Sequence, residues 1–260
     1  MASSPDGTVN AVAVEGFTDA ARYERARPGY PPAAVAWLAE HLRLAPGSVM
    51  VDLAAGTGKL TRLLVPTGAT VLAVEPVEAM RGLLAGQCPT VPVVAGAAER
   101  LPLRTGSVDA VTVAQAFHWF DADAAFAELR RVLRPGGRVG LIWNARNRDV
   151  AWVDAVWSVM DRVERKAPWR DHDKPAREAL GPRTGFGPLG EATFHHTQAV
   201  TPDGVLDRFR SISHVAVLPP PQQDAVLDEV RELLAAHPET RGRTELLLPY
   251  RVDCLWCERL

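Results

Sequence analysis

The chain has few cysteines, no long apolar run and almost no excess charge, and each of these shortages excludes a class of protein. Its three cysteines, Cys88, Cys254 and Cys257, are odd in number, which argues against a disulfide framework. No apolar run approaches the roughly 20 residues that a bilayer-spanning helix needs. A net charge of −2 provides no overall attraction to DNA or RNA. We therefore expect no membrane and no nucleic acid as partners.

Two short segments suggest other classes, which the rest of the sequence does not support. The N-terminal stretch MASSPDGTVN lacks the basic region and apolar block of a secretory signal, so we expect a cytoplasmic protein. Cys254 and Cys257 form a CxxC, but no second CxxC or nearby histidine pair supplies the remainder of the about four ligands of a zinc site. We predict no metal site and interpret both cysteines as small residues of a strand, pointing to opposite faces.

The central part of the chain alternates between apolar runs and helical patterns. Helices are predicted at 59–65 and 77–84, and a third begins after Asp121, which can cap it. Strands that are apolar along most of their length are covered on both faces, as in a parallel sheet with right-handed βαβ crossovers. Ligands of such sheets bind beyond the carboxyl ends of the strands. The predicted strands are 48–53, 70–75, 91–95, 108–114 and 138–143.

Three segments follow from this organisation. We expect a lid and an amphipathic helix in residues 1–45, a ligand-binding core in 46–145, and a substrate-covering insertion with completing strands in 146–260. In the last segment, Trp152, Trp157 and Met160 have the spacing of the buried stripe of one helix. The other predicted elements are helices at 33–42, 203–212 and 222–236 and strands at 193–198 and 244–257.

The stretch VDLAAGTGKL opens the core with a strand, an acid and two glycines. A phosphate-binding loop presents bare amides, and Asp52 would repel a pyrophosphate there, so it suits a ligand with a positive charge. Glu75, at the end of the next predicted strand, is placed to accept hydrogen bonds from a ribose diol. This combination fits S-adenosylmethionine, which has a ribose and an ammonium but no phosphate. A turn-capping role for Asp52 and a solvated strand-end role for Glu75 stay open.

Four stretches resemble the class I S-adenosylmethionine-dependent methyltransferases of the small-molecule type, with a methyltransferase type 11-like domain. The resemblance covers residues 20–145 and implies an α/β, Rossmann-like, doubly wound fold. Its mostly parallel seven-stranded sheet has an antiparallel C-terminal strand, and a helical lid segment precedes the sheet. The matching stretches are VDLAAGTG at 51–58, AVEP at 73–76, GAAERLPL at 96–103 with SVDAVTVAQAFHW at 107–119, and LRRVLRPGGRV at 129–139.

The resemblance implies S-adenosylmethionine as cofactor and gives individual residues a role. Arg27 would meet the cofactor carboxylate, and Glu75 would bind the ribose hydroxyls. Two positions depart from the family pattern: Ala54 stands where many relatives have glycine, and Ala97 where many have a polar residue that reaches the adenine amine. The implied cofactor residues are Tyr23, Arg27, Asp52, Ala54, Gly56, Thr57, Gly58, Glu75, Pro76, Met80, Ala98, Glu99, Gln115 and Ala116.

The stretch AQAFHWFD, at residues 114–121, carries the candidate chemistry. His118 has an unperturbed pKa of about 6.5, which suits a catalytic base if the acceptor must lose a proton. Relatives often carry a similar His-Trp pair whatever their substrate, so a pocket wall or a packing histidine are the alternatives. We expect His118 and Trp119, with Trp143 and Asn144 after the fifth predicted strand, to bind the substrate.

The predicted function is therefore O- or N-methylation of a small molecule by direct displacement. No Asn/Asp-Pro-Pro-Tyr stretch follows the fourth predicted strand, which disfavours acceptors that are exocyclic amines of bases. The Ala/Arg/Val-rich composition hints at secondary metabolism. Methylation of RNA or protein, and a cofactor-fold protein without transferase activity, are the alternatives. The sequence does not predict an oligomeric state.

Overall fold

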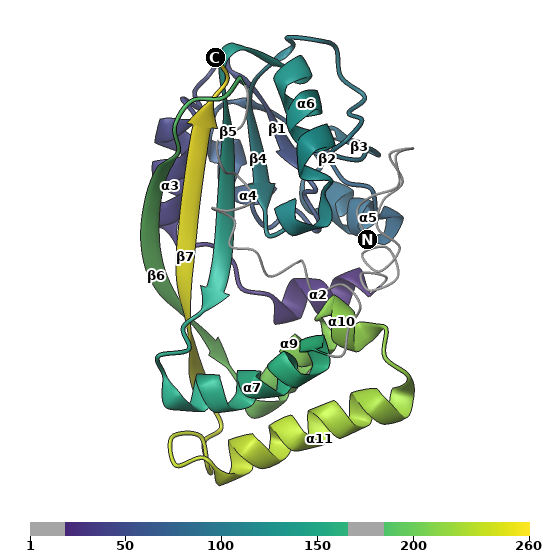
Figure 1. Ribbon diagram of the computed structural model, residues 1–260, viewed down its shortest axis with the longest axis vertical. Coiled ribbons are helices and arrows are strands. Elements are labelled where there is room, and N and C mark those ends of the chain that lie inside the picture. Colours follow the sequence, from purple (N-terminus) through teal and green to yellow (C-terminus); the bar gives the residue numbers. More distant parts are fainter. Residues whose placement is uncertain (1–18, 166–184) are drawn as a thin grey trace.

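One seven-stranded sheet carries the fold in the computed structural model, which describes residues 19–165 and 185–260 (Figure 1). The strand order is β3-β2-β1-β4-β5-β7-β6. Strands β1 to β5 pair in parallel, and β7 runs antiparallel to both of its neighbours. This confirms the predicted sheet with its antiparallel C-terminal strand. The strands are β1 (Val49–Leu53), β2 (Thr70–Val74), β3 (Val93–Val94), β4 (Val108–Ala114), β5 (Leu133–Arg146), β6 (Gly190–Val200) and β7 (Leu246–Glu258).

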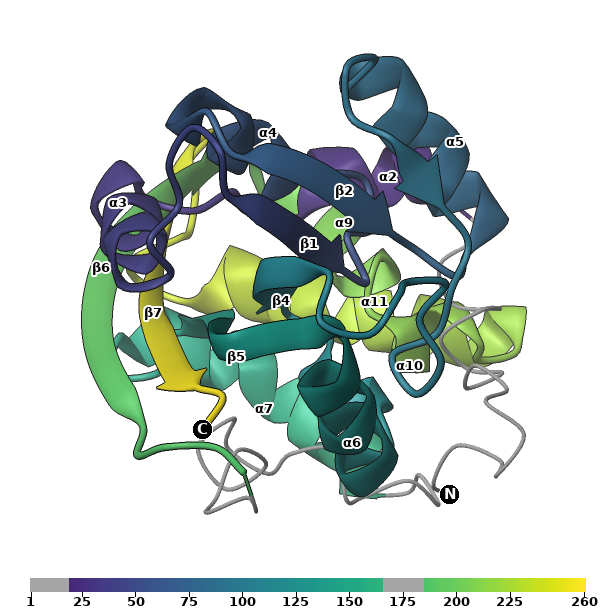
Figure 2. The same cartoon turned by 90° about the horizontal axis from the view of Figure 1, so that it is seen from above.

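Helices cover both faces of the sheet, as a doubly wound fold requires (Figure 2). On one face lie α3 (Pro32–His41), α4 (Thr61–Leu64) and α5 (Glu78–Gln87), which bury Leu38, Leu64 and Leu84 against the strands. The other face is covered by α6 (Ala122–Val132), with Phe126 and Leu129 in its core. Asp121 accepts hydrogen bonds from the first amides of α6, so the predicted cap is confirmed.

A second group of helices lies beyond the carboxyl ends of the parallel strands, below the sheet in Figure 1. We call it the cap: α7 (Ala151–Arg165), α9 (Pro202–Arg210), α10 (Ser213–Ala216) and α11 (Pro220–Ala236). Trp152, Trp157 and Met160 of α7 are buried in the core of the cap, which confirms the predicted stripe. Helix α2 (Ala20–Ala26) lies between cap and sheet. The proposed division into 1–45, 46–145 and 146–260 stays a prediction.

Strands β5 and β6 are longer than the sequence pattern predicts, whereas β3 is shorter. Strand β5 begins at Leu133, which pairs with Val108, and the register shifts before the regular pairing starts at Arg138. It ends at Arg146 rather than at Trp143, because its last residues pair with β7 as far as Tyr250. These residues are partly exposed and lack the continuous apolar run of a buried strand, so periodicity alone did not identify them.

The two cysteines of the CxxC lie on opposite faces of the sheet, as predicted. Cys254 packs with α3 and α4, and Cys257 with the core under α6. Burial raises the pKa of both thiols to about 12, so both are inert packing residues.

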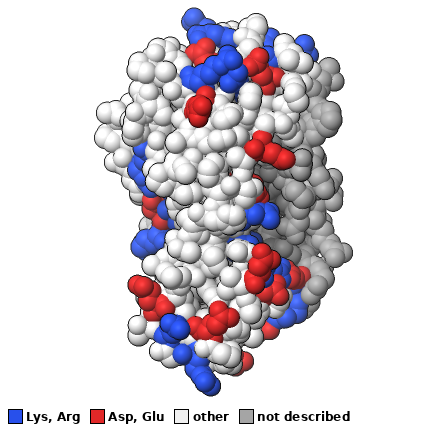
Figure 3. Space-filling view, turned by 90° about the vertical axis from the view of Figure 1, so that its left-hand side faces the viewer, with Lys and Arg blue, Asp and Glu red and all other residues white. Residues whose placement is uncertain are grey.

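Charged side chains of both signs are scattered over the described residues on the side shown in Figure 3. Lysine and arginine side chains are interspersed there with aspartate and glutamate, in keeping with the net charge of −2. Within residues 19–165 and 185–260, no helix combines the length and the apolar character that crossing a bilayer demands.

Candidate active site

Two adjoining cavities lie at the carboxyl ends of the central strands, where the sheet faces α2 and the cap. The larger has a volume of about 740 Å³ and the smaller about 490 Å³, each including its open mouth. Sequence reasoning placed the ligand site at this edge of the sheet. The residues that border both cavities are Tyr23, Ala54, Gly56, Ala114 and Gln115.

Most of the predicted site residues border one of these cavities. Arg27, Thr57 and Asn144 border the smaller one. Asp52, Gly58, His118 and Trp143 border neither. The predicted residues that border the larger cavity are Tyr23, Ala54, Gly56, Glu75, Pro76, Met80, Ala98, Glu99, Gln115, Ala116 and Trp119.

Glu75 is a buried acid in the wall of the larger cavity. It follows β2 directly, and its side chain is 4% exposed. One carboxylate oxygen accepts a hydrogen bond of 2.8 Å from the amide of Gly56, and the other accepts one of 2.8 Å from the amide of Val77. Burial raises the pKa of Glu75, and these two amides oppose that rise. The carboxylate therefore ties the glycine loop to the next strand while its remaining lone pairs are available to a ligand.

Asp52 lies behind the glycine loop rather than in a cavity wall. Its carboxylate accepts hydrogen bonds from the hydroxyls of Thr61, at 2.6 Å, and Thr112, at 2.9 Å. It is fully buried, and burial raises its pKa to about 6. Through these hydrogen bonds, Asp52 connects β1 to α4 and β4. Its charge acts on the site through space, without direct contact.

The floor shared by the two cavities is built from strained backbone. Ala54 follows β1 with φ of 53°, and Gln115 follows β4 with φ of 57°. Left-handed conformations are uncommon for residues other than glycine and concentrate at functional sites. The strained pair marks the point where the two cavities meet.

Replacing Ala54 with glycine is expected to raise the free energy of unfolding by about 0.5–1 kcal/mol, because relief of the left-handed strain exceeds the added freedom of the unfolded chain. Chemical denaturation measures it. Ala55→Gly is the matched control, since Ala55 is buried and has no positive φ. The Ala55→Gly variant should be less stable than the wild type. If Ala54→Gly is also less stable, the backbone at Ala54 is not strained.

Glu24 connects helix α2 to the glycine loop, which contains Gly56 and Gly58. The carboxylate of Glu24 accepts a hydrogen bond from the Thr57 hydroxyl and pairs with Lys59 at 3.4 Å and Arg62 at 2.7 Å. Tyr23, the neighbour of Glu24, borders both cavities. Within the segment predicted as a lid, α2 therefore lies beside the glycine loop and both cavities.

His118 lies in a cluster of rings beside the larger cavity. Its ring centroid is 4.8 Å from that of Trp119 and 5.1 Å from that of Trp143. Trp119 borders the larger cavity. Its ring centroid lies 6.2 Å from that of His214, which belongs to the cap. In this structure the imidazole packs between Trp119, which follows β4, and Trp143, which lies in the neighbouring strand β5.

Asn144 uses its side chain to hold the site together. Its amide donates to the carbonyl of Gly29 at 2.9 Å, and its side-chain oxygen lies 3.0 Å from Nε2 of His196. Gln115 donates to its backbone carbonyl at 3.3 Å. The residue borders the smaller cavity, but its amide group is occupied by protein partners.

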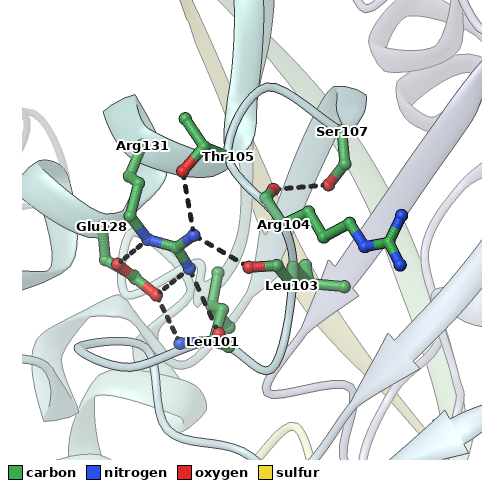
Figure 4. Close-up of polar contacts among 7 residues, drawn as sticks. All are labelled: Leu101, Leu103, Arg104, Thr105, Ser107, Glu128 and Arg131. Atoms are coloured by element: carbon green, nitrogen blue, oxygen red, sulfur yellow. Dashed lines mark hydrogen bonds and ion pairs between the residues drawn. The ribbon is translucent and has the colours of Figure 1, made fainter.

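The wall of the larger cavity that contains Ala98 and Glu99 is supported from α6. The Glu99 carboxylate accepts a hydrogen bond of 2.8 Å from the amide of Asp121. Arg131 donates to the carbonyls of Leu101 and Leu103 and pairs with Glu128, which accepts from the amide of Leu101 (Figure 4). This network fixes the loop between the cavity wall and β4.

Several residues of the site were not predicted from the sequence. Val77 and Phe120 in the larger cavity adjoin recognised stretches and were within reach of sequence reasoning. Tyr30, which lies in the stretch ARPGY after α2, borders the smaller cavity together with Arg208. Arg208 comes from the cap, far along the chain and outside any motif, so no local signal identifies it.

Comparisons with known proteins agree with this architecture. A methyltransferase-domain family model matches residues 51–141. An uncharacterized methyltransferase of Mycobacterium bovis is 40% identical over 233 residues, 90% of each chain. The chain belongs to the methyltransferase family. An uncharacterized methyltransferase-like protein of Schizosaccharomyces pombe is 34% identical over 243 residues, covering 93% of this methyltransferase and 94% of that protein.

A solved structure shares the class I fold of this methyltransferase over most of its length. It is assigned as a type II methyltransferase of Anaeromyxobacter dehalogenans, with a TM-score of 0.65 and 27% identity, and the match covers 90% of this chain and 97% of that one. The match therefore includes strands and helices beyond the family model. A demethylmenaquinone methyltransferase of Mycolicibacterium vanbaalenii is 43% identical over 101 residues, 38% of this chain and 43% of its own.

Proposed function

We propose that this methyltransferase uses S-adenosylmethionine and methylates an oxygen or nitrogen atom of a small molecule. The observation that supports it most is the Glu75 carboxylate in the wall of the larger cavity, bonded to the glycine loop. The relative named for demethylmenaquinone, a small molecule, agrees with the acceptor class. The larger cavity is lined mainly by apolar residues together with a few polar groups such as Glu75, as small-molecule sites are.

The residues of the two cavities fit this cofactor. Glu75 provides acceptors for a ribose diol, and Pro76 and Met80 provide apolar walls for a flat adenine ring. Arg27, in the adjoining cavity, provides the positive charge that a carboxylate needs. The junction at Ala54 and Gln115 then lies between the two halves of the ligand.

S-adenosylmethionine supplies a methyl group already activated on a sulfonium, so the protein has to align the acceptor and exclude water. In our proposal, α2 and the cap exclude water from above the strand ends. Trp119, held by His118 and the ring of His214, would form the wall against which the acceptor lies. Asn144 would fix the end of β5 through Gly29.

Calorimetry with the purified chain tests the cofactor. We expect saturable binding of S-adenosylmethionine and S-adenosylhomocysteine and none of NAD. A methyl-transfer screen with labelled cofactor against a metabolite extract then tests the acceptor class. Label in the small-molecule fraction is expected, whereas label only in RNA or protein would overturn that part of the proposal. Absence of cofactor binding would overturn the proposal as a whole.

Replacing His118 separates the predicted role of a catalytic base from those of a pocket wall and a packing histidine. If it is the catalytic base, both His118→Ala and His118→Gln should lower turnover of the acceptor found in the screen by about 10²-fold or more. Cofactor affinity should stay close to that of the wild type. His195→Gln is the matched control, because His195 is exposed on β6. Near-normal turnover in both His118 variants would reject the base and leave the other two roles.

A further inference from the structure

Two arginines border the smaller cavity, and within residues 19–165 and 185–260 no carboxylate pairs with either of them. Arg208 of α9 is 4% exposed, and Arg27, directly after α2, is partly buried. Lys59, the other cation that borders this cavity, is paired with Glu24. A buried charge is normally paired or serves a ligand.

Both guanidinium groups keep unused donors. Arg27 donates to the backbone carbonyl of Ser211 at 2.7 Å and to its hydroxyl at 3.1 Å. Within the described part of the chain, Arg208 makes a long contact of 3.5 Å to the same hydroxyl, and its buried Nε finds no hydrogen-bond partner there. A guanidinium has five N–H donors, so most of the capacity of Arg208 is unfilled. Unfilled buried donors in a cavity wall indicate a ligand that supplies acceptors.

The charge around Arg27 is positive on balance. Burial and the charges of Arg208 and Arg146 lower the pKa of Arg27 to about 9, whereas only the hydroxyls of Tyr23 and Tyr250 act in the opposite direction. We call Arg27, Arg146 and Arg208 the arginine cluster. Its members come from the residue directly after α2, from β5 and from the cap. It concentrates positive charge where the core meets the cap.

One carboxylate cannot neutralise the charges of both Arg27 and Arg208. S-adenosylmethionine carries a single carboxylate, which Arg27 suits, and its ammonium adds a positive charge. We propose that Arg208 binds a carboxylate of the methyl acceptor, so that the substrate is an organic acid; this rests on the proposed function. The planar fork of a guanidinium pairs with a carboxylate through two parallel hydrogen bonds. Arg208 belongs to the cap, the part of the fold that we assign to the acceptor.

Matched acid and amide probes test the proposal on the full chain. The probes are acetate and acetamide, phenylacetate and phenylacetamide, and indole-3-acetate and indole-3-acetamide. They are titrated by calorimetry with and without saturating S-adenosylhomocysteine, which fills the cofactor's own carboxylate site. In at least one pair the acid should bind about tenfold more tightly than the amide, as a charge-assisted pair predicts.

Two variants test whether Arg208 is the residue that causes this preference for the acid. Arg208→Gln should abolish it and leave the affinity for S-adenosylhomocysteine within about threefold, whereas Arg210→Gln on the same helix should retain it. If Arg208→Gln weakens S-adenosylhomocysteine and leaves the acid preference unchanged, Arg208 serves the cofactor and the proposal is wrong. It is also wrong if no acid is preferred, or if phenyl phosphate binds tenfold more tightly than phenylacetate. Failure of S-adenosylhomocysteine to bind would instead refute the proposed function, and the titrations without it would still report on Arg208.

Discussion

Replacing Glu75 with alanine is expected to weaken binding of S-adenosylmethionine by about 10²–10⁴-fold. Each hydrogen bond to a charged group contributes about 1.5–3 kcal/mol, and two ribose hydroxyls would lose their acceptor. The variant also removes the acceptor of the Gly56 and Val77 amides, so the glycine loop is released from the end of β2. Calorimetry at fixed pH and salt measures the affinity.

The neighbouring acid Glu78 provides the control. It is exposed in the first turn of α5, three residues after Glu75, and Glu78→Ala should bind the cofactor as the wild type does. Glu75→Gln keeps one acceptor oxygen and should show an intermediate loss. Circular dichroism establishes that each variant is folded. An affinity of folded Glu75→Ala within about threefold of the wild type would mean that the acid ties the loop and does not touch the ligand.

The buried carboxyl group of Asp52 is expected to make the protein less stable as pH rises. Burial raises its pKa from 3.8 to about 6 in the folded chain, so the folded state holds this proton more tightly than the unfolded state. The stabilisation is complete below the unfolded pKa and is lost as pH rises through about 6. Over that window this group should remove about 3 kcal/mol from the free energy of unfolding.

The difference between wild type and Asp52→Asn isolates this effect, because both share every other titrating group. Asp109 and Glu128, whose pKa values are lowered, act in the opposite direction and cancel in the difference. Denaturant unfolding between pH 4 and pH 7 measures it. Asp224→Asn, at an exposed position on α11, should reproduce the wild-type profile. A difference that does not change with pH would mean that Asp52 titrates as an exposed acid does.

The core of the fold was predictable because its signals are local. Strands β1, β2 and β4 are short, mostly apolar runs, and Asp121 caps the helix that follows it by accepting hydrogen bonds from its first amides. The cavity walls followed from the same signals, since Glu75 and Gln115 come directly after strands. Position along a parallel strand therefore carried most of the information about the site.

The parts that were not predicted depend on contacts between distant residues. Asp52 is placed correctly at the end of β1, but only the fold reveals that Thr112, on a neighbouring strand, bonds its carboxylate. His118 looked like a residue facing the substrate, and its packing between two tryptophans depends on the pairing of β4 with β5, which carries Trp143. Arg208 becomes part of the site only because the cap folds back over the strand ends.

Strand β7 joins two cores that would otherwise be separate. Leu248 and Tyr250, in its first half, pack in the cap, and Val252 and Cys254, in its second half, pack in the sheet. It also lies between β5 and β6, so these two strands have no shared neighbour until residues 246–258 are in place. During synthesis, the sheet therefore keeps an open edge at β5 until β7 has left the ribosome. We infer that neither the cap nor the sheet reaches its final structure until β7 is in place.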